Sequence, residues 1–118
     1  MIPSPKVATY DLQPAMSAQA ITDACIEHVR AEHPDFICLN YANPDMVGHT
    51  GVFEAVVQAC ETVDHCAETL SKELIEHGYT IIMLADHGNA DMMTNDDGSP
   101  NTAHSLAKVP CFLINASS

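Results

Sequence analysis

Two short apolar runs enclose one long amphipathic stretch, and this order limits the fold more than any other feature. Residues 36–41 and 80–85 are apolar runs of strand length. Between them, residues 51–77 carry apolar side chains in steps of three and four, with charged side chains on the opposite side, which predicts one long helix. A strand, a crossover helix and a second strand form a right-handed parallel unit. The sequence therefore predicts an α/β fold.

The rest of the chain adds one helix and one strand to this unit. Ser17 is a favourable N-cap for a helix that runs to about Glu32, where a His-Pro pair is expected to end it. Residues 109–114 form a further apolar run and predict another strand. Residues 7–12 form a short apolar stretch that fits either a strand or an extended arm.

The charge balance excludes several classes of partner. The chain has 118 residues, with 4 Lys and Arg against 16 Asp and Glu, and a formal net charge of −12. Clustered basic residues bind phosphate backbones and anionic lipids, so we expect binding neither to nucleic acid nor to a membrane surface. No apolar run approaches the roughly 20 residues that a membrane-spanning helix requires. The length fits one small domain.

The cysteines and the first residues of the chain indicate a reducing compartment. The five cysteines are an odd number without a C-x-x-C pair, so we expect buried, small apolar side chains rather than disulfide partners. They are Cys25, Cys38, Cys60, Cys66 and Cys111. The first residues have neither the charged start nor the apolar core of a secretory signal. The cytoplasm is therefore the expected location.

Five potential metal ligands lie where ligands collect in α/β proteins, beyond the carboxyl ends of the predicted strands. They are Asp45, His49, Asp86, His87 and His104. The first two are four residues apart after a proline, so one helical turn would place them on the same face. The last lies in a polar loop over residues 86–108, and loops of that length are usually functional or mobile. One such histidine alone is usually a surface or core residue, whereas the coincidence of five donors favours a metal site.

The ligand types indicate the ion and the chemistry. Mixed imidazole and carboxylate donors suit Mn, Zn or Co, whereas oxygen donors alone would suggest Mg or Ca. Five donors exceed one tetrahedral site, and two ions about 3.5–4 Å apart would hold the attacking and leaving oxygens of a phosphoryl transfer. Ser99 is assigned to a polar turn rather than to a nucleophile. The sequence thus predicts metal-assisted phosphate chemistry.

Four motifs spread over nearly the whole chain carry a resemblance to a known family. They are PSPKVATYD at 3–11, NYANPDMVGHTG at 40–51, ADHGNAD at 85–91 and DGSPNTAH at 97–104. With these motifs in this order, the chain resembles the 2,3-bisphosphoglycerate-independent (cofactor-independent) phosphoglycerate mutases of the alkaline phosphatase superfamily. The resemblance implies a partial alkaline-phosphatase-like parallel sheet with flanking helices. It also implies interconversion of 3-phosphoglycerate and 2-phosphoglycerate through a phosphoserine, a step of glycolysis and gluconeogenesis.

The resemblance also divides the five ligands between two Mn ions. Asp45, His49 and His104 match the ligands of one ion, and Asp86 and His87 match two ligands of the other. The ligand types by themselves would accept Zn or Co. The family implies phosphoglycerate as the substrate of the full-length enzyme, which is expected to be monomeric.

Two parts of the family pattern have no counterpart in this sequence. One is the segment with the nucleophilic serine, and the other is the transferase domain whose basic groups hold the phosphoglycerate. Residues 1–118 therefore resemble the C-terminal part of the phosphatase domain, and we expect no catalytic residue in this piece and no mutase activity from it alone. The alternatives are another phosphomutase or phosphatase of the same superfamily, or an inert metal-binding fragment.

Ligation by histidine predicts a pH dependence of metal binding. A metal binds neutral imidazole, whose reference pKa is about 6.5, so the affinity for Mn²⁺ should fall as the pH drops through that region. Titration calorimetry at about pH 7.5 and about pH 5.5 measures the difference, and equal affinities at the two values would contradict histidine ligation.

Overall fold

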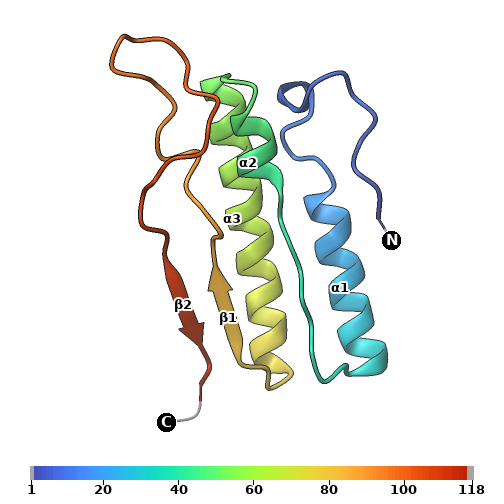
Figure 1. Ribbon diagram of the computed structural model, residues 1–118. Helices are drawn as coiled ribbons and strands as arrows, with labels where there is room; N and C mark the ends of the chain where they lie inside the picture. Colours follow the sequence, from blue (N-terminus) through green and yellow to red (C-terminus); the bar gives the residue numbers. More distant parts are fainter. Residues whose placement is uncertain (1, 117–118) are drawn as a thin grey trace.

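The computed structural model describes residues 2–116 and combines helices with one pair of strands (Figure 1). In chain order, the elements are the 3-10 helix η1 (Tyr10–Leu12), the helices α1 (Ala18–Glu32), α2 (Asn43–Gly48) and α3 (Phe53–Glu76), and the strands β1 (Ile81–Leu84) and β2 (Cys111–Ile114). The long helices α1 and α3 pack against each other, and α2 packs across the first part of α3. The loop between the two strands arches beside α2 at one end of the molecule (Figure 1).

The two long helices were predicted from the sequence, and both are confirmed. Their contact is apolar, through Val29 of α1 and Leu70 and Leu74 of α3, all buried. One detail is wrong: Ser17 makes no capping hydrogen bond to α1, because its hydroxyl donates instead to the carbonyl oxygen of Pro3 at 2.7 Å. The hydroxyl therefore ties the amino-terminal segment to the start of the helix.

The strands at 80–85 and 109–114 are confirmed as β1 and β2. They pair antiparallel, with Ile81 opposite Ile114 and Leu84 opposite Cys111. This pair is therefore not part of the parallel unit, which the sequence predicts between 36–41 and 80–85. Both strands are short, and they are joined by the long loop rather than by a crossover helix, which a parallel pair would need.

The strand predicted at 36–41 is also wrong, because this segment has no hydrogen-bonded partner strand among the described residues. It is extended and runs in the same direction as β1 (Figure 1). None of the backbone hydrogen bonds within residues 2–116 joins it to β1. Ile37 and Leu39 nevertheless pack against the same apolar cluster as Ile81 of β1. Residues 7–12 form no strand either, and end in the turn of η1.

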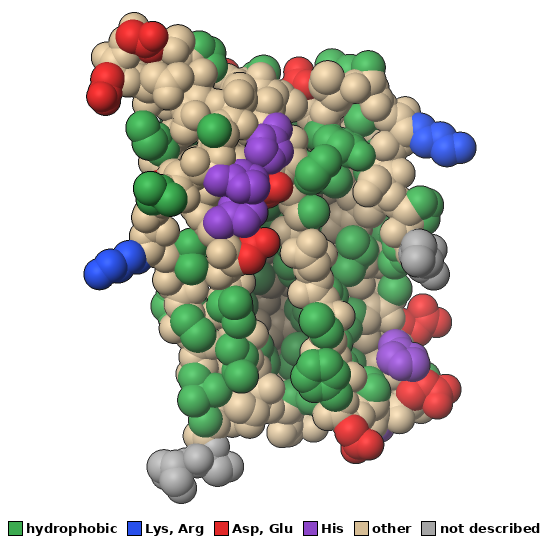
Figure 2. All heavy atoms as spheres, in the orientation of Figure 1, with side chains coloured by type: hydrophobic (Ala, Val, Ile, Leu, Met, Phe, Trp, Pro, Cys, Tyr) green, Lys and Arg blue, Asp and Glu red, His purple; other side chains and the backbone are tan. Residues whose placement is uncertain are grey.

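β1 packs on the apolar cluster of α3 through Ile81, while the outer face of the strand pair is bare. Alternation along the strands directs Ile82 of β1 and Leu113 of β2 to the same side, and these are 66% and 64% exposed. Apolar side chains gather over the two strands in Figure 2. Phe36 on the neighbouring extended segment is 82% exposed. The chain therefore carries a broad apolar surface on the side away from its helices.

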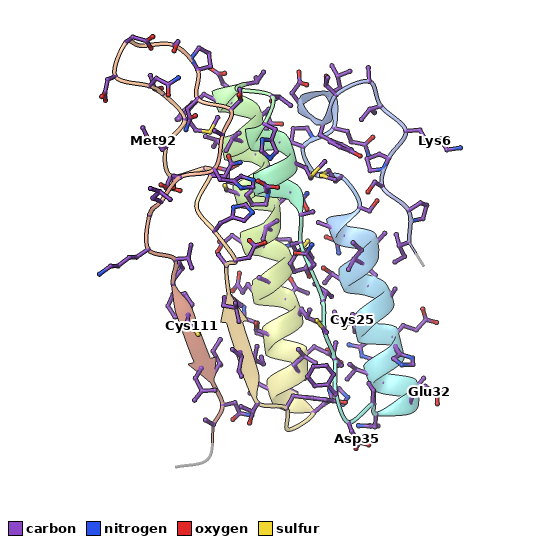
Figure 3. All side chains as sticks on the ribbon, viewed as in Figure 1. Lys6, Cys25, Glu32, Asp35, Met92 and Cys111 are labelled. Atoms are coloured by element: carbon purple, nitrogen blue, oxygen red, sulfur yellow. The ribbon has the colours of Figure 1, made fainter. Side chains whose placement is uncertain are left out.

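The cysteines follow the same division, and the expectation that they are buried is only partly correct. All five are free thiols, as expected, but only Cys66 is fully buried. Cys25 on α1 is half-buried, and desolvation raises the pKa of its thiol. Three are exposed: Cys38, Cys60 and Cys111, the last labelled on β2 in Figure 3. Cys38 and Cys111 are exposed because the extended segments that carry them have no cover on their outer side.

A second apolar cluster, at the other end of α3, supports α2 and the long loop. It contains Val47 of α2, Ala55 and Ala59 of α3, and Met93 of the loop, all buried. These contacts hold the loop between the strands against α2. Within the described residues, no helix combines the length and the apolar composition needed to cross a membrane.

An ion pair between the long helices predicts a pH-dependent contribution to stability. The Arg30 guanidinium donates to both carboxylate oxygens of Glu73, at 2.6 and 2.8 Å, and these hydrogen bonds lower the pKa of the Glu73 carboxyl. A lowered pKa stabilises the fold above the carboxyl's ordinary range and loses this effect as the pH falls through its folded value. The variant Arg30→Gln should therefore be less stable than the parent chain at neutral pH, and this difference should close in acid.

Denaturant unfolding at a series of pH values from neutral to below about pH 4 measures this difference. The matched control is Lys72→Gln, which removes the ion pair of Lys72 with Glu68 within α3, where both side chains are exposed. The control should show a smaller loss at neutral pH because exposed pairs within one helix contribute little. A difference for Arg30→Gln that stays constant across the pH series would contradict the assignment.

Candidate metal centre

The short helix α2 carries the first two predicted ligands. A proline near its start favours the helical turn, Asp45 lies in the first turn, and His49 follows as the C-cap. The four-residue spacing brings the two side chains together, with the Nε2 atom of His49 3.2 Å from the Oδ1 atom of Asp45. The buried side chain of Val47 anchors α2 against α3, so this turn has a fixed position.

The end of β1 and the long loop bring two more histidines to the same carboxylate. Ser105 donates its backbone N–H to the carbonyl oxygen of Gly88 at 2.8 Å, which holds the two parts of the loop side by side. His87 and His104 consequently stack, with their ring centres 3.7 Å apart. The Nε2 atom of His104 lies 3.0 Å from Asp45 Oδ1, and that of His87 lies 4.0 Å from it.

Hydrogen bonds to backbone carbonyls orient two of the rings. His49 Nδ1 lies 2.7 Å from the carbonyl oxygen of Thr102, and His87 Nδ1 lies 3.3 Å from that of Gly88. A carbonyl oxygen only accepts, so each ring donates from Nδ1 and, when neutral, keeps an unprotonated Nε2. Both Nε2 atoms point toward Asp45. This second partner on the far nitrogen is the usual arrangement around metal-binding histidines.

Asp86 lies at the edge of this group. Its side chain is 86% exposed, one oxygen accepts the backbone N–H of His87 at 3.0 Å, and the other lies 3.6 Å from His87 Nε2. The donor atoms of Asp45, His87 and His104 all lie within 4.8 Å of one another. The family resemblance assigns His87 and Asp86 to one ion and His104 to the other. In the structure, His87 stacks on His104 instead of lying apart from it. The assignment of individual ligands to two ions stays a prediction.

The donor set fits a divalent cation. Three imidazole nitrogens face one carboxylate oxygen, and mixed nitrogen and oxygen donors suit borderline ions such as Mn, Zn or Co. The histidines gather on one face of the molecule, while the Lys and Arg side chains visible on that face lie at its edges (Figure 2). Figure 3 shows Lys6 on the amino-terminal arm, on the opposite side of α2 from Met92 in the loop. The group can therefore bind a cation but has no basic neighbour on this face for a phosphate.

Two supporting contacts were missed at the sequence level. Asn89 donates from Nδ2 to Asp45 Oδ1 at 2.9 Å, and the Ser105 hydroxyl lies 2.9 and 2.7 Å from the two carboxylate oxygens of Asp91. Asn89 and Asp91 stand in the motif that carries His87, and this proximity was the available signal. Ser99 lies in a turn, where its backbone N–H donates to the side chain of Asp97, as predicted.

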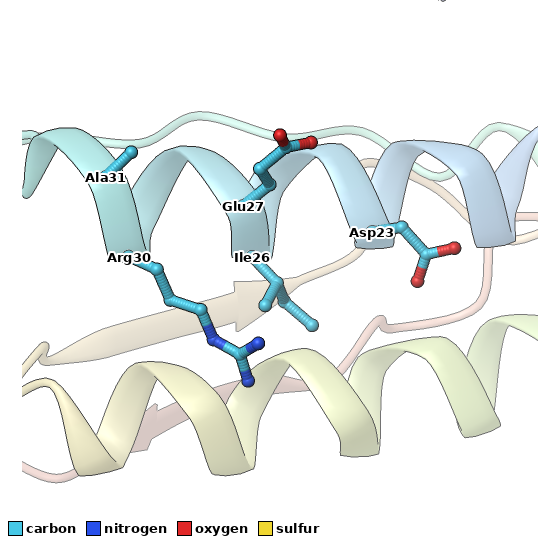
Figure 4. A pocket seen from close by; sticks show the side chains of 5 residues that line it. All are labelled: Asp23, Ile26, Glu27, Arg30 and Ala31. Carbon is cyan, nitrogen blue, oxygen red and sulfur yellow. The ribbon is translucent and has the colours of Figure 1, made fainter.

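A hollow of about 570 Å³ lies elsewhere, on the surface of α1 (Figure 4). It is lined by Asp23, Ile26, Glu27, Arg30 and Ala31. Its one cation, Arg30, is already paired with Glu73 of α3. The convergent donors lie at the histidine group instead, so we place the functional site there.

The site and the fold define a metal-binding protein of mixed helices and strands, and the comparisons with known proteins agree with this class. The sequence profile of the Metalloenzyme superfamily matches residues 1–118, so the chain belongs to that superfamily. Membership supports dependence on a divalent metal.

The relatives that the chain resembles are phosphoglycerate mutases. It is 54% identical over 111 residues to a 2,3-bisphosphoglycerate-independent phosphoglycerate mutase of Flavobacterium johnsoniae, covering 94% of this chain and 22% of that protein. It is 51% identical over 114 residues to the Bacteroides fragilis protein of the same name, covering 97% of this chain and 23% of the relative. The chain thus spans less than a quarter of the length of these relatives.

A solved structure matches the fold as well as the sequence. The chain superposes on a phosphoglycerate mutase of Leishmania mexicana, solved at low cobalt concentration, with a TM-score of 0.86 and 33% identity. The match covers 95% of this chain and 22% of that one. The chain therefore has the fold of one segment of a larger phosphoglycerate mutase.

The geometry of the histidine group predicts which residues bind the metal. His104→Ala and His49→Ala should each lower the affinity for Mn²⁺ by more than the roughly 10–100-fold typical of losing a supporting contact, because each removes a donor atom. Titration calorimetry measures the loss. The control is His65→Ala, an exposed histidine on α3 that lies outside the group. An equal loss in the control and in His104→Ala would contradict the site.

Proposed function

We propose that this chain is the metal-binding, C-terminal part of the phosphatase domain of a 2,3-bisphosphoglycerate-independent phosphoglycerate mutase. The observation that carries this proposal is the convergence of three histidines on Asp45, in a chain more than half identical to a segment of such a mutase. The whole enzyme would interconvert 3-phosphoglycerate and 2-phosphoglycerate, as a monomer in the cytoplasm. Five free cysteines are compatible with that compartment.

In this proposal the site holds two Mn ions. Asp45, His49 and His104 hold one ion, and Asp86 and His87 contribute to the other. Bound divalent ions supply charge stabilisation to the oxygens of a phosphoryl group in transfer. The backbone carbonyls that accept from His49 and His87 keep those rings in one orientation. The high exposure of Asp86 and the separation of His87 from Asp45 leave room for further donors from the rest of the protein.

The bare apolar surface supports the proposal that this chain is one part of a larger enzyme. The segment at 36–41 and β1 run in the same direction, and they have no ladder hydrogen bonds to each other. Ile82, Leu113 and Phe36 are exposed on their outer side. Sheets with parallel strands are covered by helices on both faces, and here only one face is covered. We infer that the remainder of the enzyme completes a parallel, alkaline-phosphatase-like sheet and covers this surface.

The same remainder would bring the catalytic groups that this chain lacks. The nucleophilic serine that carries the phosphoryl group and the transferase domain that holds the phosphoglycerate would both belong to it. Within the described residues, the only basic side chains are Lys6, Arg30, Lys72 and Lys108, and a chain of net charge −12 offers little to a phosphorylated acid. Substrate binding therefore depends on the remainder.

This division predicts that the chain alone has no mutase activity. With 3-phosphoglycerate and Mn²⁺, the purified chain should convert no more substrate than its His104→Ala variant does, as measured by the formation of 2-phosphoglycerate. A chimera in which this chain replaces the matching segment of the Flavobacterium johnsoniae mutase should be active, because the two segments are 54% identical.

The chimera also distinguishes the proposed function from its alternatives. His104→Ala within the chimera should abolish the conversion, whereas His65→Ala should leave it intact. A folded chimera that binds Mn²⁺ but converts no phosphoglycerate would overturn the proposal and favour another phosphomutase, a phosphatase or an inert fragment. Conversion by the chain alone, above the His104→Ala variant, would contradict the division between the two parts.

A further inference from the structure

Asn89 lies directly against the central carboxylate of the histidine group. It is only 6% exposed, and its Nδ2 atom donates to Asp45 Oδ1 at 2.9 Å. The same carboxylate oxygen faces His49 at 3.2 Å and His104 at 3.0 Å. Asn89 is therefore an uncharged hydrogen-bond donor to Asp45. It shares the Asp45 Oδ1 atom with the imidazole nitrogens of His49 and His104.

The opposite end of the Asn89 amide has no partner. Its Oδ1 atom is buried and accepts no hydrogen bond among the described residues. A reversed amide would turn this oxygen toward the carboxylate oxygen of Asp45, where the two would repel. The carboxylate thus determines the orientation of the amide. A buried polar group left unsatisfied costs stability, and such groups are expected where a function requires them.

Gly48 makes room for this amide. A Cβ atom added at Gly48 would lie 2.0 Å from Asn89 Oδ1, well inside the distance of any real contact. Gly48 is the last residue of α2, and its backbone is not in the left-handed region, so its conformation alone would accept alanine. In a helix, alanine is the more favourable residue. Gly48 therefore leaves the space that the Asn89 amide occupies.

We propose that Asn89, in the space left by Gly48, is a positioning residue that holds the Asp45 carboxylate in the orientation required for metal binding. The inference rests on the proposed metal-binding role of Asp45. Without this hydrogen bond, the carboxylate is free to rotate about its side-chain bonds, and its alignment with His49 and His104 is lost. Outer contacts of this kind typically change metal affinity by about 10–100-fold.

The test measures binding of Co²⁺, whose visible absorption reports the ligand geometry, to the chain and its variants. Asn89→Ala and Gly48→Ala should each weaken binding by about 10–100-fold and change the absorption bands. In the Asn89→Ala background, Gly48→Ala should add no more than about a twofold further loss, because the amide that the new methyl group displaces is already gone. Additive losses would show that the two residues act separately and would overturn the proposal.

Asn101→Ala is the matched control. The Asn101 amide donates to the carbonyl oxygen of Met92 within the same loop and does not contact Asp45. A purely structural effect on the loop would weaken Co²⁺ binding equally in Asn101→Ala and Asn89→Ala, and that result would overturn the proposal. The expected result is parent-like affinity and absorption for Asn101→Ala.

Two further measurements keep the outcomes distinct. If His104→Ala abolishes Co²⁺ binding while Asn89→Ala leaves it unchanged, the positioning role is wrong and the metal site stands. If neither variant changes Co²⁺ binding, the metal site itself is wrong, and the proposed function with it. A variant that does not fold alone, judged by circular dichroism, is measured by the same absorption in the chimera, where the remainder of the mutase supports the fold.

Discussion

The molecule depends on the buried stripe of α3. One part of this helix, with Leu70 and Leu74, packs against α1, against the extended segment at 36–41 and against β1. The other part, with Ala55 and Ala59, packs against α2 and the long loop. Because one rigid helix supports both groups, the loop that carries His104 and the short helix that carries Asp45 are held in fixed relation. The predicted metal ligands therefore converge through apolar packing at a distance from them.

Hydrogen bonds orient the side chains that the apolar contacts bring together. Thr102 orients His49 through its carbonyl oxygen, and Asn89 holds Asp45. Ser105 binds both oxygens of Asp91, next to the bridge that stacks His104 on His87. The uncharged partners Thr102 and Asn89 set the direction of the proposed ligand side chains without adding charge that would compete for an ion. These contacts give the side chains of the group defined directions.

The sequence predicted those features that depend on local pattern. The periodicity of residues 51–77 located α3, the apolar run at 80–85 located β1, and the spacing of Asp45 and His49 placed both on one turn. It did not predict features that depend on distant neighbours. A strand at 36–41 requires a partner edge, and pairing cannot be read from an apolar run by itself.

The contribution of Asn89 was equally hidden, because it depends on the close approach of Gly48 from a different element. A glycine in a short helix and an asparagine in a polar loop have no spacing that connects them along the chain. The exposure of Cys38 and Cys111 was not predicted for a related reason. Their burial would need another part of the structure to cover the extended segments that carry them. The apolar periodicity of one segment predicts which of its faces is apolar, but it does not predict which other segment covers that face.

The predicted metal ligands lie at the ends of the two extended segments that border the bare surface. The segment at 36–41 leads directly into α2 and Asp45, and β1 leads directly into Asp86 and His87. Both run toward the histidine group; β1 pairs with β2 along one edge only, and the segment at 36–41 pairs along neither edge. A strand that paired with either of them in the same direction would end beside the same group. Ligands of α/β proteins collect at that end of a sheet, so in the proposed enzyme a completing strand would bring its own side chains to the histidine group. In the proposed enzyme, one further layer would both cover the open surface and bring additional donors to the site.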